Sequence, residues 1–129
     1  KLRIDAGLKP ELVTRTLEIQ EEDLNDSLYV TKVSVRWYRE LLGAIKDAFE
    51  DIPEFQDVPM LLMQGGDDKV VDKRPVREWF NYNQCSEKQF KEWPGLYHEI
   101  FNEPERNDVF TYALSFVETR LKTLGYVVQ

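Results

Sequence analysis

The chain has 129 residues, of which 42% are hydrophobic, and a net charge of -7. This length and composition are typical of one globular domain with a modest core. The negative charge argues against a nucleic-acid partner, because phosphates attract lysine and arginine. The sequence contains no run of about eighteen apolar residues, which predicts no membrane span. Cys85 is the single cysteine and cannot pair within the chain, which favours a reducing, cytoplasmic location.

The first thirty residues are polar and only weakly periodic. Pro10 and the three residues after it predict a short helix, because proline is tolerated in a first turn. Residues 21–24 predict another turn of helix. Neither segment has an apolar face large enough to be stable alone, so we expect the region to cover another part of the protein.

Residues 34–50 show a clear helical pattern. Apolar side chains recur there at spacings of three and four, which places them on one helix face: Val35, Tyr38, Leu42, Ile45 and Phe49. Ser34 is a suitable N-cap, and residues 51–53 end the helix.

A loop over residues 54–58 leads to Pro59 and the apolar run of residues 60–63. A short continuous apolar run predicts a strand buried on both faces of a parallel sheet. Proline is permitted at the first position of a strand. The glycine pair at positions 65 and 66 then ends the predicted strand.

The remaining pattern predicts a helix over 73–82, a weaker strand over 88–93 and a final helix that Gly125 terminates. One face of the final helix is expected to hold Val109, Ala113, Val117, Leu121 and Leu124. The order of helix, strand, helix, strand and helix predicts an α/β fold. Because two strands do not form a stable open sheet, we expect further strands from outside this chain.

Candidate catalytic residues follow both predicted strands. Asp67 and Asp68 come after the first strand, and His98, the only histidine, comes after the second. Functional groups of α/β sheets gather at the carboxyl ends of the strands, and neighbouring parallel strands end at the same edge. A carboxylate there would orient the imidazole, which would then act as a general base.

Other interpretations remain open at this stage. A lone histidine is often structural, and aspartates after glycines often serve only a turn. His98 lacks the second histidine of a zinc-protease helix. The aspartates lack the phosphate-binding loop that would favour magnesium, and Gly65-Gly66 is too short for a dinucleotide fingerprint. We therefore expect no metal and no cofactor.

The chain offers no serine nucleophile. Hydrolases of this architecture present serine within Gly-x-Ser-x-Gly on a strand-to-helix turn. The serines here lack those glycines and do not follow a predicted parallel strand: Ser27, Ser34, Ser86 and Ser115. Because the sequence also begins without methionine, we expect it to be a piece of a longer protein.

Three stretches carry a family resemblance: residues 58–71, residues 93–103, and residues 25–28 with 33–36 and 39–42. They resemble, in turn, the penultimate strand with its acid loop, the histidine loop, and the end of the cap with its following helix. The family is the monoacylglycerol lipase and bacterial lysophospholipase group of α/β-hydrolases. The chain is similar to the C-terminal portion of that fold, with Ser27 where the group usually has proline.

This resemblance implies two parts, residues 1–30 as part of a cap over the acyl-binding pocket and residues 31–129 as part of the hydrolase core. The sheet would be incomplete in this chain, with the last two parallel strands and their flanking helices present. The substrates would be fatty-acyl esters such as monoacylglycerols or lysophospholipids. A peripheral contact with a membrane surface stays open.

The resemblance also assigns site residues. Asp68 is favoured over Asp67 as the acid of a Ser-Asp-His triad, because the family's acid is the fourth residue counted from Gly65. His98 would be the base, and Glu103 matches a recurrent glutamate that would hold the histidine loop. The serine and the oxyanion-hole residues would lie upstream, in a partner segment, so the isolated chain is expected to be inactive.

A second hypothesis is a non-catalytic helical interaction module, in which Asp68 and His98 are ordinary surface residues. The missing nucleophile and the acidic, helix-rich surface motivate it.

Overall fold

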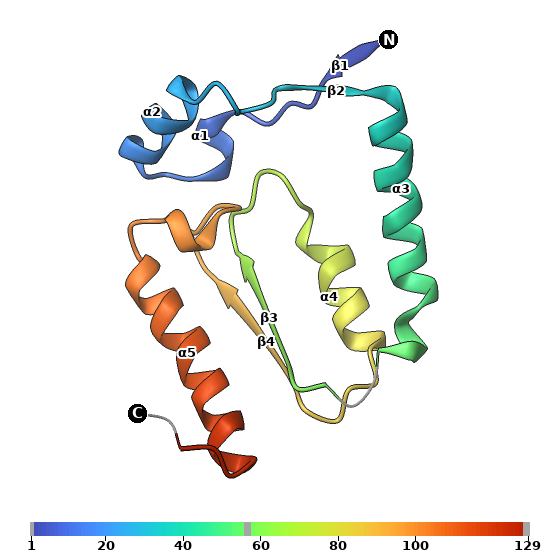
Figure 1. The fold of residues 1–129 in the computed structure, drawn as a ribbon, viewed down its shortest axis with the longest axis vertical. Coiled ribbons are helices and arrows are strands. Elements are labelled where there is room, and N and C mark those ends of the chain that lie inside the picture. Colours follow the sequence, from blue (N-terminus) through green and yellow to red (C-terminus); the bar gives the residue numbers. More distant parts are fainter. Residues whose placement is uncertain (1, 56–57, 128–129) are drawn as a thin grey trace.

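The computed structural model describes residues 2–55 and 58–127. Its elements in chain order are β1 (Arg3–Asp5), α1 (Pro10–Val13), α2 (Leu17–Asn25), β2 (Lys32–Ser34), α3 (Val35–Glu50), η1 (Ile52–Glu54), β3 (Met60–Gly65), α4 (Lys73–Tyr82), β4 (Lys88–Trp93), η2 (Ile100–Asn102) and α5 (Arg106–Thr123). Figure 1 shows β3 and β4 side by side at the centre, with α4 and α5 to either side and the N-terminal segment across one end.

The main predicted elements are confirmed. α3 begins after Ser34, whose Oγ accepts a hydrogen bond of 3.1 Å from the backbone N–H of Trp37, as an N-cap does. α4 and β4 have the predicted bounds. Gly125 follows α5 with φ +84°, the left-handed conformation that glycine adopts most easily after a helix.

Three features differ from the sequence expectations. The strand predicted over residues 60–63, which is β3 in the structure, extends to Gly65 because its parallel pairing with β4 continues through Gln64 and Gly65. β1 and β2 form an antiparallel pair that the polar N-terminal sequence did not indicate. The second helix is longer than one turn, at Leu17–Asn25. The predicted loop over 54–58 includes residues 56 and 57, which lie outside the described residues.

The apolar face expected for the final helix is only partly buried. Val109 is fully buried, but Val117 is 49% exposed and Leu124 is 69% exposed. α5 instead contacts the sheet through Tyr112, whose ring packs edge-on against Trp93 at 5.8 Å between centroids. The Tyr112 ring, which is not one of the five residues on that face, thus forms part of the interface between α5 and the sheet.

The parallel pair places its two carboxyl ends at one edge. The register runs from Met60 opposite Lys88 to Gly65 opposite Trp93. Phe90 packs on Phe80 of α4, at 5.3 Å between centroids, whereas Trp93 packs on α5. Side chains alternate along a strand, so residues 90 and 93 point to opposite faces and the two helices cover opposite faces.

The buried core lies beneath the carboxyl ends of the strands. It consists of Leu96, Ile100 and Val109, with Met63 and Trp93 packed against them. The side chains of residues 60–63 are only half-buried, although the sequence predicted burial on both faces. Within residues 2–55 and 58–127, β3 pairs only with β4, so its other edge lacks a neighbouring strand.

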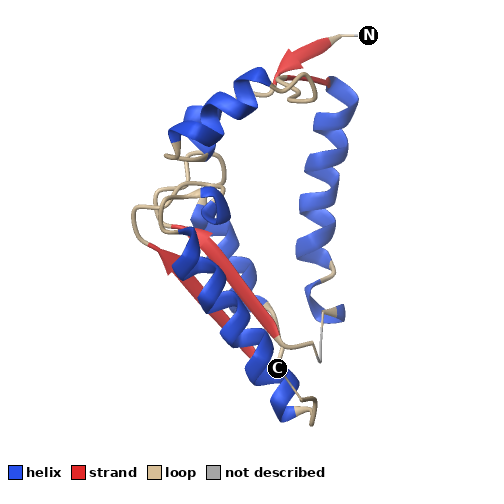
Figure 2. Cartoon of the chain, turned by 60° about the vertical axis from the view of Figure 1, so that its left-hand side comes forward, coloured by secondary structure: helices blue, strands red, loops and turns tan. Residues whose placement is uncertain are grey.

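α3 lies beyond α4, on the side away from α5 (Figure 1), and Figure 2 shows it standing apart from the two central strands. Its C-terminal end is anchored, because the indole N–H of Trp79 donates to the carbonyl of Ala48 at 2.7 Å. Its apolar face stays largely open, with Tyr38 46% and Leu42 49% exposed. In the described part of the chain, the helices are too short or too polar to cross a membrane.

Candidate active site

Two loops meet at the carboxyl ends of β3 and β4. Backbone hydrogen bonds join them directly: Gly66 N–H donates to the Trp93 carbonyl at 2.7 Å, and Asp67 N–H donates to the Leu96 carbonyl at 3.0 Å. The close approach requires glycine at position 65, where a Cβ atom would lie 2.1 Å from the Tyr97 carbonyl oxygen. The parallel register and these contacts hold residues 66–72 against residues 94–103.

The structure brings Asp68 and His98 together across this junction. Oδ2 of Asp68 lies 2.9 Å from Nδ1 of His98. The Asp68 side chain is 3% exposed, whereas that of His98 is 38% exposed. The buried carboxylate therefore engages one ring nitrogen of a partly open imidazole, and Nε2 is left as the nitrogen that can accept a proton from a bound group.

Hydrogen-bond donors surround the Asp68 carboxylate. Oδ1 accepts from the backbone N–H groups of Val70 at 2.8 Å and Val71 at 2.9 Å, and Oδ2 also accepts from Nε2 of Gln64 at 2.7 Å. Burial acts to raise the pKa of Asp68. The hydrogen bonds from Val71, His98 and Val70 outweigh burial and hold that pKa below its ordinary value. The side chain is thus an anion at neutral pH.

The other candidates from the sequence do not join this pair. Asp67 is exposed, and it contributes its backbone N–H to the loop junction. Ser34 Oγ caps α3, and Ser115 Oγ donates to the Thr111 carbonyl inside α5. Cys85 is buried, with Sγ 3.1 Å from the Phe55 carbonyl oxygen.

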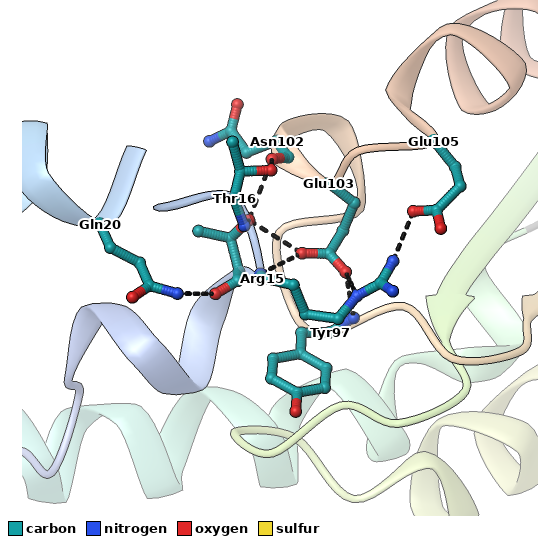
Figure 3. A network of polar contacts seen from close by, with 8 residues as sticks. Arg15, Thr16, Gln20, Tyr97, Asn102, Glu103 and Glu105 are labelled. Carbon is teal, nitrogen blue, oxygen red and sulfur yellow. Dashed lines mark hydrogen bonds and ion pairs between the residues drawn. The ribbon is translucent and has the colours of Figure 1, made fainter. Parts of the chain in front are cut away.

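Glu103 is the most deeply buried charged side chain near the site, with no exposed surface. Its Oε1 accepts from Thr14 Oγ1 at 2.8 Å and from the Arg15 N–H at 2.6 Å. Its Oε2 accepts from Arg15 Nε at 2.6 Å and from the Tyr97 N–H at 3.1 Å. Figure 3 shows this network, in which the Arg15 guanidinium also reaches Glu105.

Further hydrogen bonds join the N-terminal segment to the histidine loop. Thr16 Oγ1 donates to the Asn102 carbonyl at 2.6 Å, and Glu99 N–H donates to the Val13 carbonyl at 2.8 Å. Gln20 Nε2 supports the segment by donating to the Thr14 carbonyl at 2.8 Å (Figure 3). Glu103 and residues 13–16 thus hold both sides of the loop that carries His98. The family resemblance indicated Glu103 but offered no sign of its partners Thr14 and Arg15, which lie almost ninety positions away.

Acid should weaken this connection. Burial acts to raise the pKa of Glu103, but its hydrogen bonds, first that from the Arg15 side chain, hold the pKa below the ordinary 4.5. A carboxyl group whose pKa is lower in the folded state stabilises the fold above its unfolded pKa. Its contribution is lost as the pH falls from about 4.5 through the folded-state pKa.

The variant Glu103→Gln is expected to lower the free energy of unfolding at pH 7 by about 3 kcal/mol, because a buried ion pair loses one partner and an amide NH2 meets other donors. The loss should shrink in urea titrations as the pH falls from about 4.5 through the lower folded-state pKa, because the unfolded and then the folded wild-type carboxylate becomes protonated over that range. The difference between pH 7 and acid pH is the diagnostic measurement.

Glu105→Gln is the matched control. Glu105 also contacts Arg15, but its side chain is 44% exposed, so the change should cost about 0.5 kcal/mol or less. Equal effects of the two substitutions at pH 7 would contradict the role assigned to the buried carboxylate.

The sequence of this chain is similar to a known protein family and to several characterised proteins. Residues 1–105 match the family described as Serine aminopeptidase, S33 (Hydrolase_4). The chain is 55% identical over 117 residues to phospholipase YtpA of Bacillus subtilis, covering 91% of this chain and 45% of that protein. It is 32% identical over 63 residues to monoacylglycerol lipase of Mycolicibacterium smegmatis, covering 49% of this chain and 22% of that protein.

Solved structures show the same fold. A soluble variant of monoglyceride lipase from Saccharomyces cerevisiae, in complex with a substrate analogue, superimposes with a TM-score of 0.79 at 22% identity, over 92% of this chain and 44% of that chain. Monoacylglycerol lipase of Paleococcus ferrophilus superimposes with a TM-score of 0.70 at 26% identity, over 88% and 44%. The predicted α/β-hydrolase fold is therefore confirmed, and the chain spans less than half the length of these proteins.

Proposed function

Because the chain belongs to the serine aminopeptidase family of α/β-hydrolases, we propose that it is the C-terminal part of a serine hydrolase that cleaves fatty-acyl esters. Monoacylglycerols and lysophospholipids are the substrates we propose. The printed names of the similar proteins, a phospholipase and monoacylglycerol lipases, support this substrate class. The observation that carries the proposal is the 2.9 Å contact between the buried Asp68 carboxylate and the partly open His98 imidazole.

In the proposed mechanism, Asp68 is the acid and His98 is the general base of a Ser-Asp-His triad. A serine Oγ from an upstream segment attacks the ester carbonyl carbon, and Nε2 of His98 takes its proton. The imidazolium is stabilised by Asp68 and then protonates the departing alcohol as the ester bond breaks. His98 next deprotonates a water, whose oxygen attacks the acyl carbon of the acyl-enzyme. The resulting imidazolium then gives that proton to the departing serine Oγ, which releases the fatty acid and the free serine.

The upstream segment is the proposed partner of this chain. Its presence would account for the open apolar face of α3 and for the unpaired edge of β3, which a complete sheet would cover. We further propose that residues 1–30 belong to the cap and residues 31–129 to the core. The contacts of residues 13–16 with the histidine loop support a place for the first segment directly over the site.

A cytoplasmic location and a peripheral membrane contact complete the proposal. Exposed apolar side chains of the N-terminal segment, including Leu24 at 71% and Leu28 at 82%, support access to lipid substrates. A non-catalytic interaction module is less well supported. Such a module does not require a buried aspartate that accepts hydrogen bonds from three other groups and also contacts an imidazole.

A substrate panel tests the proposal on the full-length protein that carries this chain. We expect turnover of a monoacylglycerol and of a lysophosphatidylcholine, and no turnover of an amino-acid p-nitroanilide. A fluorophosphonate probe should label one serine and abolish both activities, because it traps the nucleophile covalently. Hydrolysis of the anilide alone would instead assign a peptidase.

The isolated 129-residue chain serves as the control. It should show no turnover and no labelling, because its serines do not stand in a Gly-x-Ser-x-Gly turn. Labelling of the isolated chain would show that it holds the nucleophile itself.

A further inference from the structure

Gln64 is a buried polar side chain in an otherwise apolar strand. It precedes Gly65 at the end of β3, follows the four apolar residues 60–63, and is 7% exposed. A buried amide costs free energy unless it is hydrogen-bonded. Its Nε2 donates to Oδ2 of Asp68 at 2.7 Å. The amide must present its nitrogen there, because its oxygen would repel the carboxylate.

We propose that Gln64 is a positioning residue for the acid–histidine pair, because its amide N–H and Nδ1 of His98 share one carboxylate oxygen, Oδ2 of Asp68. The inference rests on the proposed function and extends it to a residue that does not touch the imidazole.

The geometry explains what Gln64 adds. Backbone N–H groups of Val70 and Val71 hold Oδ1, so one end of the carboxylate is set by the acid loop itself. The other end, Oδ2, is held by Gln64 and by His98. Since the imidazole is partly open to solvent, the strand-borne amide is the more rigid of these two donors. It restricts rotation of the carboxylate and with it the direction of the imidazole.

The shared contact also lowers the negative charge that Oδ2 of Asp68 presents to the imidazole. The amide N–H draws electron density from the oxygen that faces the imidazole, which makes that oxygen a weaker acceptor. Without this donor, Oδ2 would carry more negative charge and would bind the imidazolium more strongly than the neutral imidazole. The two effects make separate predictions, one for the rate and one for its pH dependence.

Gln64→Met in the full-length protein is the test, because methionine keeps the length of the side chain and removes the donor. We expect kcat to fall about tenfold with KM within about twofold, since the contact acts on the geometry of the base. The acid limb of the kcat/KM profile should move to higher pH by about half a unit.

Gln89→Met is the matched control, because Gln89 is exposed on the neighbouring strand β4 and lies outside the acid and histidine loops. It should leave kcat and the pH profile unchanged. Gln64→Glu is the second variant, of equal length, and should lower kcat further, since a carboxylate beside Asp68 replaces attraction by repulsion.

The outcomes are distinct. Lower kcat with the shifted acid limb in Gln64→Met supports the inference, and wild-type kcat with an unmoved limb overturns it. If Gln64→Met does not fold, a lower kcat in Gln64→Glu supports the inference and a wild-type value overturns it.

Failure of the proposed ester hydrolysis can be distinguished from failure of the inference about Gln64. If the wild type cleaves no ester, the downfield imidazole proton resonance, assigned by its loss in His98→Ala, replaces the kinetic readout. A shift of that resonance in Gln64→Met supports the shared-oxygen arrangement, and an unchanged resonance overturns it.

Discussion

Asp68→Asn is expected to lower kcat of the full-length hydrolase about 10,000-fold. All four contacts of the Asp68 carboxylate are with donors, namely Gln64, Val70, Val71 and the His98 imidazole. An asparagine NH2 would therefore face a donor in either orientation. Turned toward His98, it would force Nδ1 to accept and place the ring proton on Nε2, where the base must be free.

Kinetics with Asp67→Asn as the matched control test this expectation. Asp67 is the adjacent, exposed carboxylate, so its replacement should change kcat by less than about twofold. The double variant Asp68→Asn/His98→Ala should be no slower than His98→Ala alone, because the members of the proposed triad would act as a unit. A large loss in Asp67→Asn, with Asp68→Asn near wild type, would reverse the assignment of the acid.

Gly65→Ala is expected to lower the free energy of unfolding by about 3 kcal/mol or more and to reduce kcat about 100-fold. The added Cβ would lie 2.1 Å from the Tyr97 carbonyl oxygen and 2.7 Å from the Leu96 carbonyl oxygen. Both atoms are backbone, so a side-chain rotation cannot relieve the overlap. The loop must move, and it carries His98 with it.

A graded series of alanine substitutions checks this effect by thermal melts and steady-state kinetics. At Gly66 the nearest backbone atom to an added Cβ is the Trp93 carbonyl oxygen at 2.9 Å, so a smaller loss is expected. At Gly43, in the middle of α3, a Cβ would meet nothing within 4 Å, and alanine should stabilise the helix by up to about 1 kcal/mol. A Gly65→Ala protein with wild-type melting and rate would show that the loops are not packed this tightly.

Periodicity predicted the main elements because their local signals agree with their tertiary packing. The apolar spacing of residues 34–50 and the Ser34 cap coincide with α3, and residues 73–82 coincide with α4. The β1–β2 pair was missed because each strand has only three residues and a single apolar one, Ile4 or Val33, which is too short a segment for a periodic pattern to stand out. Their pairing depends on backbone hydrogen bonds between segments about thirty residues apart.

The candidate site was predicted only in part. Asp68 and His98 stand thirty positions apart, and the strand–helix–strand order between them was enough to expect their proximity. The sequence did not predict a role for Gln64, because a single glutamine in a strand cannot be distinguished from any other polar residue by sequence pattern. Its role emerges only from its burial and from the 2.7 Å contact with the aspartate.

The α/β order and the two loops that hold Asp68 and His98 could be predicted from the sequence, because they follow from local periodicity and strand topology. The tertiary structure adds the 2.9 Å contact of His98 with Asp68, the aspartate that the family resemblance favours. The face of α5 that packs on the sheet and the contacts of Glu103 with Thr14 and Arg15 became evident only in the tertiary structure. Such contacts depend on side-chain direction and on register between distant segments. No local pattern encodes that information, because it arises only when distant segments pack together and their buried polar groups find hydrogen-bond partners.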